Sequence, residues 1–356
     1  MQINNLSDLG WNHFFQSQLD LESLETQLPF RVVSVERNRI ECLGLDSGGQ
    51  QKQLAISTYH WRDEPPEGHP AIGDWLMLSL EHQPINLLER KSLIKRRSAG
   101  RESSIQLIAS NIDTAFIVTS CNEEFSINRI ERYLSIAAES NIHAVVVLTK
   151  TDLVSEVACY VTEITRAHAN LPVEPVNATD PTSLRVLEKW IDHGQSVALL
   201  GSSGVGKSTI INGLKGQQDQ ATGAIRQSDS RGRHTTTARS LHQLPNGGLL
   251  LDNPGMRELQ LVDSEDGIKA TFSDIDSLAE ACRFTDCQHT DEPGCAVTKA
   301  VKAGQLDQRR LDNYQKLLTE QARNSESLAE RRSNDRALGR FYKSALKTSK
   351  RFKSRE

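Results

Sequence analysis

Residues 201–209 read GSSGVGKST. It matches the phosphate-binding pattern G-x-x-x-x-G-K-[ST] at every fixed position. The apolar run 196–200 (SVALL) precedes it and predicts a short buried strand, and residues 210–214 can continue it as a helix. In such a strand–loop–helix unit, backbone N–H groups and the helix N-terminus attract phosphate. A glycine-rich turn without a ligand is the alternative interpretation.

The loop assigns roles to individual residues. We expect Lys207 to reach the β- and γ-phosphates of a nucleotide and Ser208 to hold Mg²⁺. The residues expected to contact the phosphates are Gly201, Ser202, Ser203, Gly204, Val205, Gly206, Lys207, Ser208 and Thr209. The loop by itself does not distinguish adenine from guanine.

Composition limits the class of protein. The chain has 356 residues, enough for two or three domains, and 25% of them are charged. No apolar run approaches the roughly 20 residues that span a bilayer, and the N-terminus lacks the basic and apolar regions of a secretory signal. We therefore expect a cytoplasmic monomer with no membrane partner.

The formal net charge of −4 is unevenly distributed. Residues 331–356 contain ten basic and two acidic side chains, a sum of +8, which leaves −12 on the remainder of the chain. A basic tail on an acidic body indicates a polyanionic partner.

Strand and helix patterns alternate from residue 112 onward. The segments 112–120 (IDTAFIVTS) and 143–150 (HAVVVLTK) predict strands, and 127–140 has apolar residues at helical spacing. This alternation predicts a doubly wound parallel sheet, whose ligands bind at the carboxyl ends of the strands. The second strand ends in the tetrapeptide Thr149-Lys150-Thr151-Asp152.

This tetrapeptide favours guanine. An ionised Asp152 can accept hydrogen bonds from both N1–H and N2–H₂ of guanine, a donor pair that adenine lacks, and the stem of Lys150 can cover the base. GTPases carry Asn-Lys-x-Asp here, so Thr149 keeps one hydroxyl but lacks the amide. Asn177 and Ala178 follow the short strand 172–176 and predict a second base loop, in which the Ala178 N–H meets guanine O6.

Two later segments are expected to sense the γ-phosphate. Residues 217–233 are polar and rich in glycine and serine, and they lead to His234 and three threonines, one of which could complete the Mg²⁺ shell; a plain surface loop is the alternative. The apolar strand 248–251 ends in Asp252-Asn253-Pro254-Gly255. We expect Asp252 to hold Mg²⁺ through water and the Gly255 N–H to contact the γ-phosphate.

The N-terminal third has a different pattern. Short strands between Gly/Pro turns predict a small β-barrel, one strand of which places Leu76, Leu78 and Leu80 on one face. An oligonucleotide-binding (OB) barrel fits this size, and a β module that only packs on its neighbour is the alternative. Residues 90–104 carry six basic side chains and predict a basic connector, and residues 1–29 predict an arm or a short helix.

Four potential metal ligands cluster near the C-terminus: Cys282, Cys287, His289 and Cys295. Three thiolates and an imidazole form a tetrahedral zinc set with no position left open, which predicts a structural rather than a catalytic ion. Beyond the cluster, residues 311–318 have the spacing of a helix.

The order of these motifs identifies a resemblance. They run base loop, phosphate loop, switches, whereas an ordinary small GTPase has the phosphate loop first, so the sequence resembles a circularly permuted GTPase. The barrel, the stretches GRHTTTAR (232–239) and DNPGMREL (252–259), and the Cys/His cluster make residues 30–314 similar to the ribosome small-subunit-dependent GTPase A family (RsgA/YjeQ).

The resemblance implies a multidomain α/β fold. It consists of an N-terminal OB-like β-barrel, a central circularly permuted P-loop GTPase with a doubly wound parallel sheet, and a C-terminal zinc-binding α domain. The implied boundaries are an arm at 1–29, the barrel at 30–98, the GTPase domain at 99–270, the zinc domain at 271–320 and a basic C-terminal helix or tail at 321–356.

The resemblance also implies a function. The protein would hydrolyse GTP to GDP and phosphate with Mg²⁺, carry one structural Zn²⁺, be stimulated by the small ribosomal subunit, and act in late maturation of that subunit through contacts with its rRNA. Family members carry a hydrophobic residue in place of the catalytic glutamine; here it is Met256, which cannot orient the attacking water, so we expect a slow intrinsic rate. The expected catalytic residues are Lys207, Ser208, Asp252 and His234.

Two alternatives remain from the residues. One is an RNA-binding scaffold that binds GTP with little turnover, which Thr149 and Met256 favour. The other is a P-loop kinase, which would prefer ATP; Asp152 and the permuted order disfavour it.

Overall fold

The computed structural model describes residues 1–97, 105–216, 239–252, 259 and 261–325. Its N-terminal segment contains three short helical turns, η1 (Leu6–Leu9), α1 (His13–Gln16) and α2 (Leu21–Thr26). Asparagine or aspartate side chains cap each of them, as is usual where a helix begins in a polar segment. The arm predicted for residues 1–29 is therefore locally helical.

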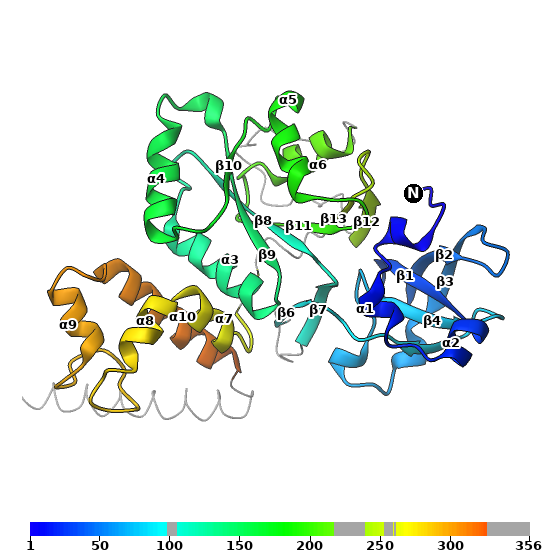
Figure 1. Cartoon of the computed structure of the whole chain (residues 1–356), viewed down its shortest axis with the longest axis horizontal. Helices are drawn as coiled ribbons and strands as arrows, with labels where there is room; N and C mark the ends of the chain where they lie inside the picture. Colours follow the sequence, from blue (N-terminus) through cyan, green and yellow to red (C-terminus); the bar gives the residue numbers. More distant parts are fainter. Residues whose placement is uncertain (98–104, 217–238, 253–258, 260, 326–356) are drawn as a thin grey trace, which may run out of the picture.

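An antiparallel β-module follows, at the right of Figure 1. Its strands are β1 (Gln27–Val35), β2 (Arg39–Leu45), β3 (Gln51–Ser57), β4 (Trp75–Ser79) and β5 (Pro84–Leu87), paired in the order β3-β2-β1-β4-β5. The turns η2 (Thr58–Trp61) and η3 (Pro66–Gly68) lie between β3 and β4. Leu76 and Leu78 are fully buried in the module's core, whereas Leu80, which was predicted on the same face, lies beyond the end of β4 and is 49% exposed.

A mostly parallel sheet forms the centre of the molecule. Strands β8 (Thr114–Ser120), β9 (His143–Thr149), β10 (Val173–Pro175), β11 (Ser196–Leu200) and β13 (Leu249–Asp252) lie in the order β10-β9-β8-β11-β13. All of these neighbours are parallel, and β12 (Arg239–Gln243) adds an antiparallel strand beside β13. The chain enters this sheet at β8, and β11, the strand before the glycine-rich loop, is the fourth of these strands in sequence and lies between β8 and β13.

Helices cover both faces of this sheet, as the doubly wound prediction requires. Alternate residues of a strand point to opposite faces. Ile117 of β8 packs in one core with Ile130 of α3 (Ile127–Glu139), whereas Phe116 packs in the other with Ile210 of α6 (Lys207–Lys215). The first core also receives α4 (Val157–Ala167), and the second receives α5 (Pro181–Leu184) and η5 (Arg185–Trp190).

The β-module and the parallel sheet are continuous. Strand β1 pairs with β12 through Ser34↔Ser240 and Val35↔Arg239, which joins eleven strands into one sheet. The fully buried Arg31 of β1 also connects the two parts through hydrogen bonds. Its guanidinium donates to the carbonyl oxygens of Leu9, Gly73 and Asn111 and to the Ser196 hydroxyl of β11.

The basic connector predicted at 90–104 is a strand in part. Residues Leu93–Arg97 form β6, which pairs antiparallel with β7 (Ile105–Ser110) in a separate two-stranded sheet. Lys95 and Arg96 of this strand are half-buried, and Lys95 pairs with Glu67 and Asp263. A strand whose polar side chains face outward does not show as an apolar run, which explains the difference from the sequence.

The C-terminal helices pack beside α3, at the lower left of Figure 1. They are α7 (Glu265–Thr271), α8 (Ser273–Ala279), α9 (Ala296–Lys302) and α10 (Gln308–Ser325). The helix predicted around 311–318 is confirmed, with Leu311, Tyr314 and Leu317 buried. Among the described residues, no helix combines the length and apolar character needed to cross a membrane.

Candidate nucleotide site and metal centre

The glycine-rich loop leaves the carboxyl end of the central strand β11 and opens α6 at Lys207. Gly201 has a φ of +150°, and a Cβ there would lie 2.4 Å from the Val118 carbonyl oxygen of β8. Only glycine fits this close approach, which explains the first glycine of the pattern. Gly206 precedes the helix with a φ of +98° and turns the chain into α6.

The Lys207 side chain lies within the loop. Its Nζ donates to the carbonyl oxygen of Gly201 at 2.6 Å and also to that of Ser202. The ammonium is thus held against the backbone at the start of the loop. Ser208 and Thr209 follow in the first turn of the helix and are partly buried.

The predicted base loop lies beside the phosphate loop. Thr149 ends β9 and is fully buried, and its hydroxyl lies 2.6 Å from the Val205 carbonyl oxygen and 3.2 Å from that of Thr119. Lys150 has a left-handed backbone with φ +58°, which turns the chain into η4 (Thr151–Leu153). Thr149 therefore links two loops that are 56 residues apart in sequence, and Asp152 is left exposed at the same edge of the sheet.

The second predicted base loop follows β10. The Asn177 side chain accepts hydrogen bonds from the Thr179 N–H at 3.0 Å and the Thr179 hydroxyl at 2.7 Å, and the Asn177 N–H donates to the Ser183 hydroxyl at 2.9 Å. These bonds fix the loop around Ala178, which packs against the core beneath α6.

Asp252 is the last residue of β13 and pairs in register with Ser240 of β12. The structure therefore brings the glycine-rich loop, both predicted base loops and Asp252 to the carboxyl edge of the sheet. His234, Gly255 and Met256 lie outside the described residues.

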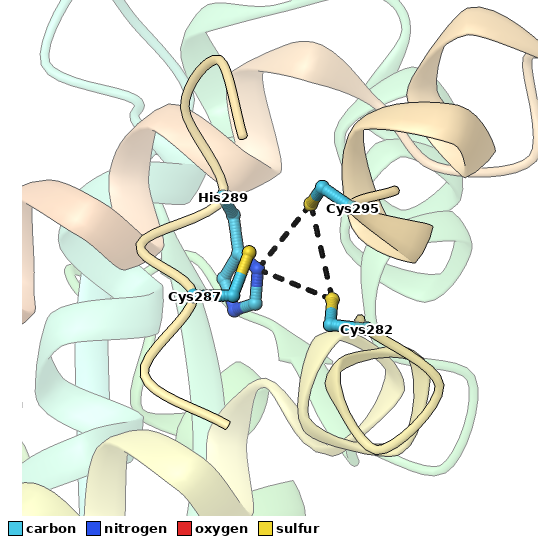
Figure 2. Close-up of side chains that lie close together, drawn as sticks. All are labelled: Cys282, Cys287, His289 and Cys295. Atoms are coloured by element: carbon cyan, nitrogen blue, oxygen red, sulfur yellow. Dashed lines mark hydrogen bonds between the residues drawn. The ribbon is translucent and has the colours of Figure 1, made fainter. Parts of the chain in front are cut away.

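The four predicted metal ligands converge, as Figure 2 shows. Their donor atoms all lie within 4.8 Å of one another. The His289 Nδ1 lies 3.7 Å from the Cys282 Sγ and 3.6 Å from the Cys295 Sγ, and these two sulfurs are 3.9 Å apart. A tetrahedral Zn²⁺ at ordinary bond lengths requires S···S of about 3.8 Å and S···N of about 3.6 Å. The cluster is therefore compatible with zinc.

Backbone N–H groups donate to two of the sulfurs, and the surroundings of Cys295 favour the thiolate, the form that binds zinc. The Ala296 N–H donates to the Cys282 Sγ at 3.3 Å, and the Thr298 N–H donates to the Cys295 Sγ at 3.4 Å at the start of α9. Burial opposes ionisation of Cys295, but hydrogen bonds from Thr298 and His289 outweigh it and lower its pKa to about 6. Burial raises the pKa of Cys287 to about 11, with the neighbouring sulfurs contributing, a crowding that a bound cation would relieve.

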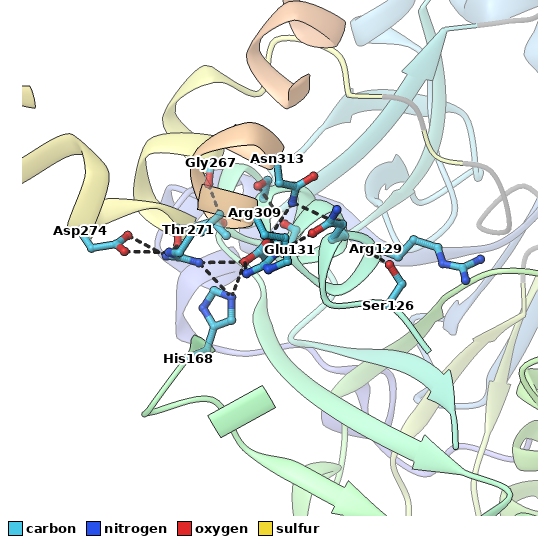
Figure 3. Close-up of polar contacts among 12 residues, drawn as sticks. Ser126, Arg129, Glu131, His168, Gly267, Thr271, Asp274, Arg309 and Asn313 are labelled. Carbon is cyan, nitrogen blue, oxygen red and sulfur yellow. Dashed lines mark hydrogen bonds and ion pairs between the residues drawn. The ribbon is translucent and has the colours of Figure 1, made fainter. Parts of the chain in front are cut away.

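The sequence did not reveal a buried charged cluster around Glu131, shown in Figure 3. Glu131 lies on α3 with no solvent exposure and contacts Arg309 and Arg310 of α10. One signal was present in the sequence: Glu131 follows Ile127 by four positions and precedes Leu134 by three, so it lies on the same face of the predicted helix as these apolar residues. A carboxylate on that face requires partners.

The doubly wound sheet and the loop at the end of its central strand define the class, an α/β protein of the P-loop type. A sequence model described as RsgA GTPase matches residues 87–262. The chain is 46% identical over 353 residues to "Small ribosomal subunit biogenesis GTPase RsgA 2" of Vibrio vulnificus (strain CMCP6), covering 99% of this chain and 98% of the relative. The chain therefore belongs to the RsgA GTPase family.

Other relatives agree with this membership. "Small ribosomal subunit biogenesis GTPase RsgA" of Mesorhizobium japonicum is 43% identical over 325 residues, covering 90% of this chain and 91% of the relative. Two solved structures share the fold at 23% identity. The crystal structure of YjeQ from Thermotoga maritima matches with a TM-score of 0.60 over 83% of this chain and 98% of that chain. That of YloQ, described as a circularly permuted GTPase, matches with a TM-score of 0.59 over 85% and 97%.

Proposed function

We propose that this protein hydrolyses GTP and acts in the biogenesis of the small ribosomal subunit. The observation that carries the proposal is the Thr149 hydroxyl bond to Val205, because it places the candidate guanine loop against the candidate phosphate loop. Membership of the RsgA GTPase family and the names of the relatives support the same activity and partner.

Base recognition falls to Asp152 in this proposal. Its carboxylate is exposed at the carboxyl edge of the sheet, where it can accept the two adjacent donors of guanine. Lys150, whose backbone is in the left-handed region, turns the chain so that its side chain and Asp152 leave the strand at this edge. Ala178 offers a backbone N–H from the second loop, which Asn177 fixes.

Phosphate recognition falls to residues 201–209. The backbone N–H groups of the loop and the N-terminus of α6 bind the phosphates, and Lys207 moves its ammonium from the loop carbonyls to the phosphate oxygens. Ser208 and Asp252 would hold Mg²⁺, which neutralises charge that develops on the transferred phosphoryl group. His234 and Gly255 complete the proposed set.

The remaining modules supply the proposed RNA contacts. We propose that residues 30–98 act as an OB-like barrel and that 271–320 form a zinc-binding domain with Zn²⁺ on the Cys282, Cys287, His289 and Cys295 cluster. The donor set and its distances support a structural ion, since all four tetrahedral positions are filled by protein. The remaining proposed segments are the arm at 1–29, a GTPase domain at 99–270 and the basic segment 321–356. The protein so proposed is a cytoplasmic monomer that binds rRNA.

Phosphate release tests the proposal. We would measure it from GTP and from ATP, with the protein alone, with isolated small subunits and with large subunits as the control. We expect slow release from GTP alone, a large rise with small subunits only, and no rise for Lys207→Ala. GTP binding with no rise would favour a scaffold with little turnover, and equal use of ATP would overturn the guanine assignment.

A further inference from the structure

The buried cluster around Glu131 joins the C-terminal helices to the GTPase sheet. The Arg309 guanidinium donates to both Glu131 oxygens, at 3.0 and 3.1 Å, and the Arg310 Nη1 donates to the Glu131 Oε1 at 2.9 Å. The Asn313 side chain donates to the Glu131 Oε2 as well. A single carboxylate of α3 thus accepts hydrogen bonds from three side chains of α10 (Figure 3).

Arg310 extends the cluster to the helices that precede the metal centre. It donates to both oxygens of Asp274 at 2.7 Å and to the Thr271 carbonyl oxygen at 3.0 Å. Its guanidinium also lies over the Phe272 ring, 4.7 Å from the ring centre. Through this one residue, α10, the α7–α8 junction and α3 form a common contact.

The cluster also reaches the helix that follows the base loop. His168, next after the end of α4, has its Nε2 3.6 Å from the Glu131 Oε1 and 3.5 Å from the Arg310 Nη1. Along the chain, α3 comes directly before β9 and α4 comes directly after η4. The two helices therefore flank the segment that carries Lys150 and Asp152. Phe125, two residues before the start of α3, packs edge to face on Tyr160 of α4, with ring centres 5.0 Å apart.

We propose that the Glu131 cluster is a coupling joint between the guanine loop and the C-terminal helices that carry the Cys/His centre. If the buried carboxylate loses its guanidinium partners, its charge is left uncompensated away from water, at a large cost in free energy. We therefore expect the contact to form or break as a unit. Movement of α3 and α4 on nucleotide binding is therefore passed to α10. Because such coupling is reciprocal, a partner that displaces the C-terminal helices changes the affinity for the nucleotide.

The proposal rests on the proposed nucleotide site, and hydrogen exchange tests it without ribosomes. Peptides covering α10 would be followed in the full chain with and without saturating GDP, with GDP binding measured on the same samples. The variant Glu131→Gln keeps the shape and removes the charge. Its matched control is Glu320→Gln, which breaks the Arg132–Glu320 ion pair between the same two helices; both of those side chains are 26% exposed.

We expect GDP to slow exchange in α10 at least about 5-fold in the unsubstituted protein and in Glu320→Gln, and to leave α10 unchanged in Glu131→Gln. If Glu131→Gln does not fold, Arg309→Lys, which keeps the charge but loses the paired geometry, is expected to lose the same response. GDP binding without any change in α10 overturns the joint alone, as does an equal response in Glu131→Gln. Failure of the unsubstituted chain to bind GDP overturns the nucleotide site, and the joint's role falls with it.

Discussion

Replacing Thr149 with valine tests the link between the two nucleotide loops. Valine has the shape of threonine without the hydroxyl, so Thr149→Val removes the 2.6 Å bond to the Val205 carbonyl oxygen and keeps the packing. Thr149 has no solvent exposure, so the carbonyl is left without that donor in a dry environment. A lost buried hydrogen bond costs about 1 kcal/mol, and an unsatisfied partner costs about 1–3 kcal/mol.

This free-energy cost can appear as lower folding stability or as weaker GTP binding. If the phosphate loop keeps its shape without the bond, the free energy of unfolding falls by about 1–2 kcal/mol and GTP affinity is unchanged. Because the bond holds the loop against β9, we expect part of the cost in binding, with a dissociation constant for GTP about 5- to 10-fold higher. Urea unfolding and titration with a fluorescent GTP analogue separate the two contributions.

Thr149→Ser is the matched control, because it keeps the hydroxyl and loses only a methyl group. It is expected to bind GTP nearly as the unsubstituted protein does. If Thr149→Val binds GTP as tightly as Thr149→Ser and is equally stable, the hydroxyl link does not position the loops and the reasoning is refuted.

Three further changes test other parts of the structure. Cys295→Ser is expected to reduce bound zinc from one ion per chain to a small fraction and to lower the melting temperature. Cys159→Ser, at an exposed position outside the cluster, is the control and should leave both quantities unchanged. Metal analysis and calorimetry would measure the two quantities. Burial opposes ionisation of Glu131, but hydrogen bonds from His168, Arg309 and Asn313 and the Arg309 charge lower its pKa from 4.5 to about 2, so its contribution of about 3 kcal/mol is fully present above pH 4.5 and lost as the pH falls toward 2. Acid unfolding of Glu131→Gln should therefore lack this component, and an unchanged acid profile would contradict the assignment. Gly201→Ala is expected to weaken GTP binding at least about 10-fold. The new Cβ would lie 2.4 Å from the Val118 carbonyl oxygen, so the loop must shift, at a strain energy of about 1–3 kcal/mol. Unaltered binding in the same titration would show that the close approach is not needed.

The sequence predicted best the elements that bury both faces. The runs at 112–120 and 143–150 became β8 and β9, since central parallel strands consist almost entirely of apolar residues. The helix at 127–140 became α3 because its apolar spacing and the Ser126 cap agree with each other. Convergence of the Cys/His cluster followed from ligand types and spacing.

The contacts that the sequence did not predict join distant residues. The pairing of β1 with β12 connects Ser34 with Ser240, and no local pattern marks an antiparallel edge of that kind. The partners of Glu131 lie 178 and 179 residues away, on a helix whose polar face gave no sign of them. Residues 149–152 predict a base loop, but no pattern in the sequence shows that the Thr149 hydroxyl bonds backbone groups within the core.

The most direct test of the account is the base preference of Asp152→Asn. An asparagine amide offers one donor and one acceptor, which matches the C2 carbonyl and N1–H of xanthine and no longer matches the two donors of guanine. We would measure the dissociation constants of GTP, XTP and ATP for the unsubstituted protein and for this variant. We expect the preference to move from GTP to XTP, while ATP binding stays weak in both proteins. An unchanged preference, or equal affinity for ATP in the unsubstituted protein, would contradict the claim that residues 149–152 and 201–209 form one guanine nucleotide site.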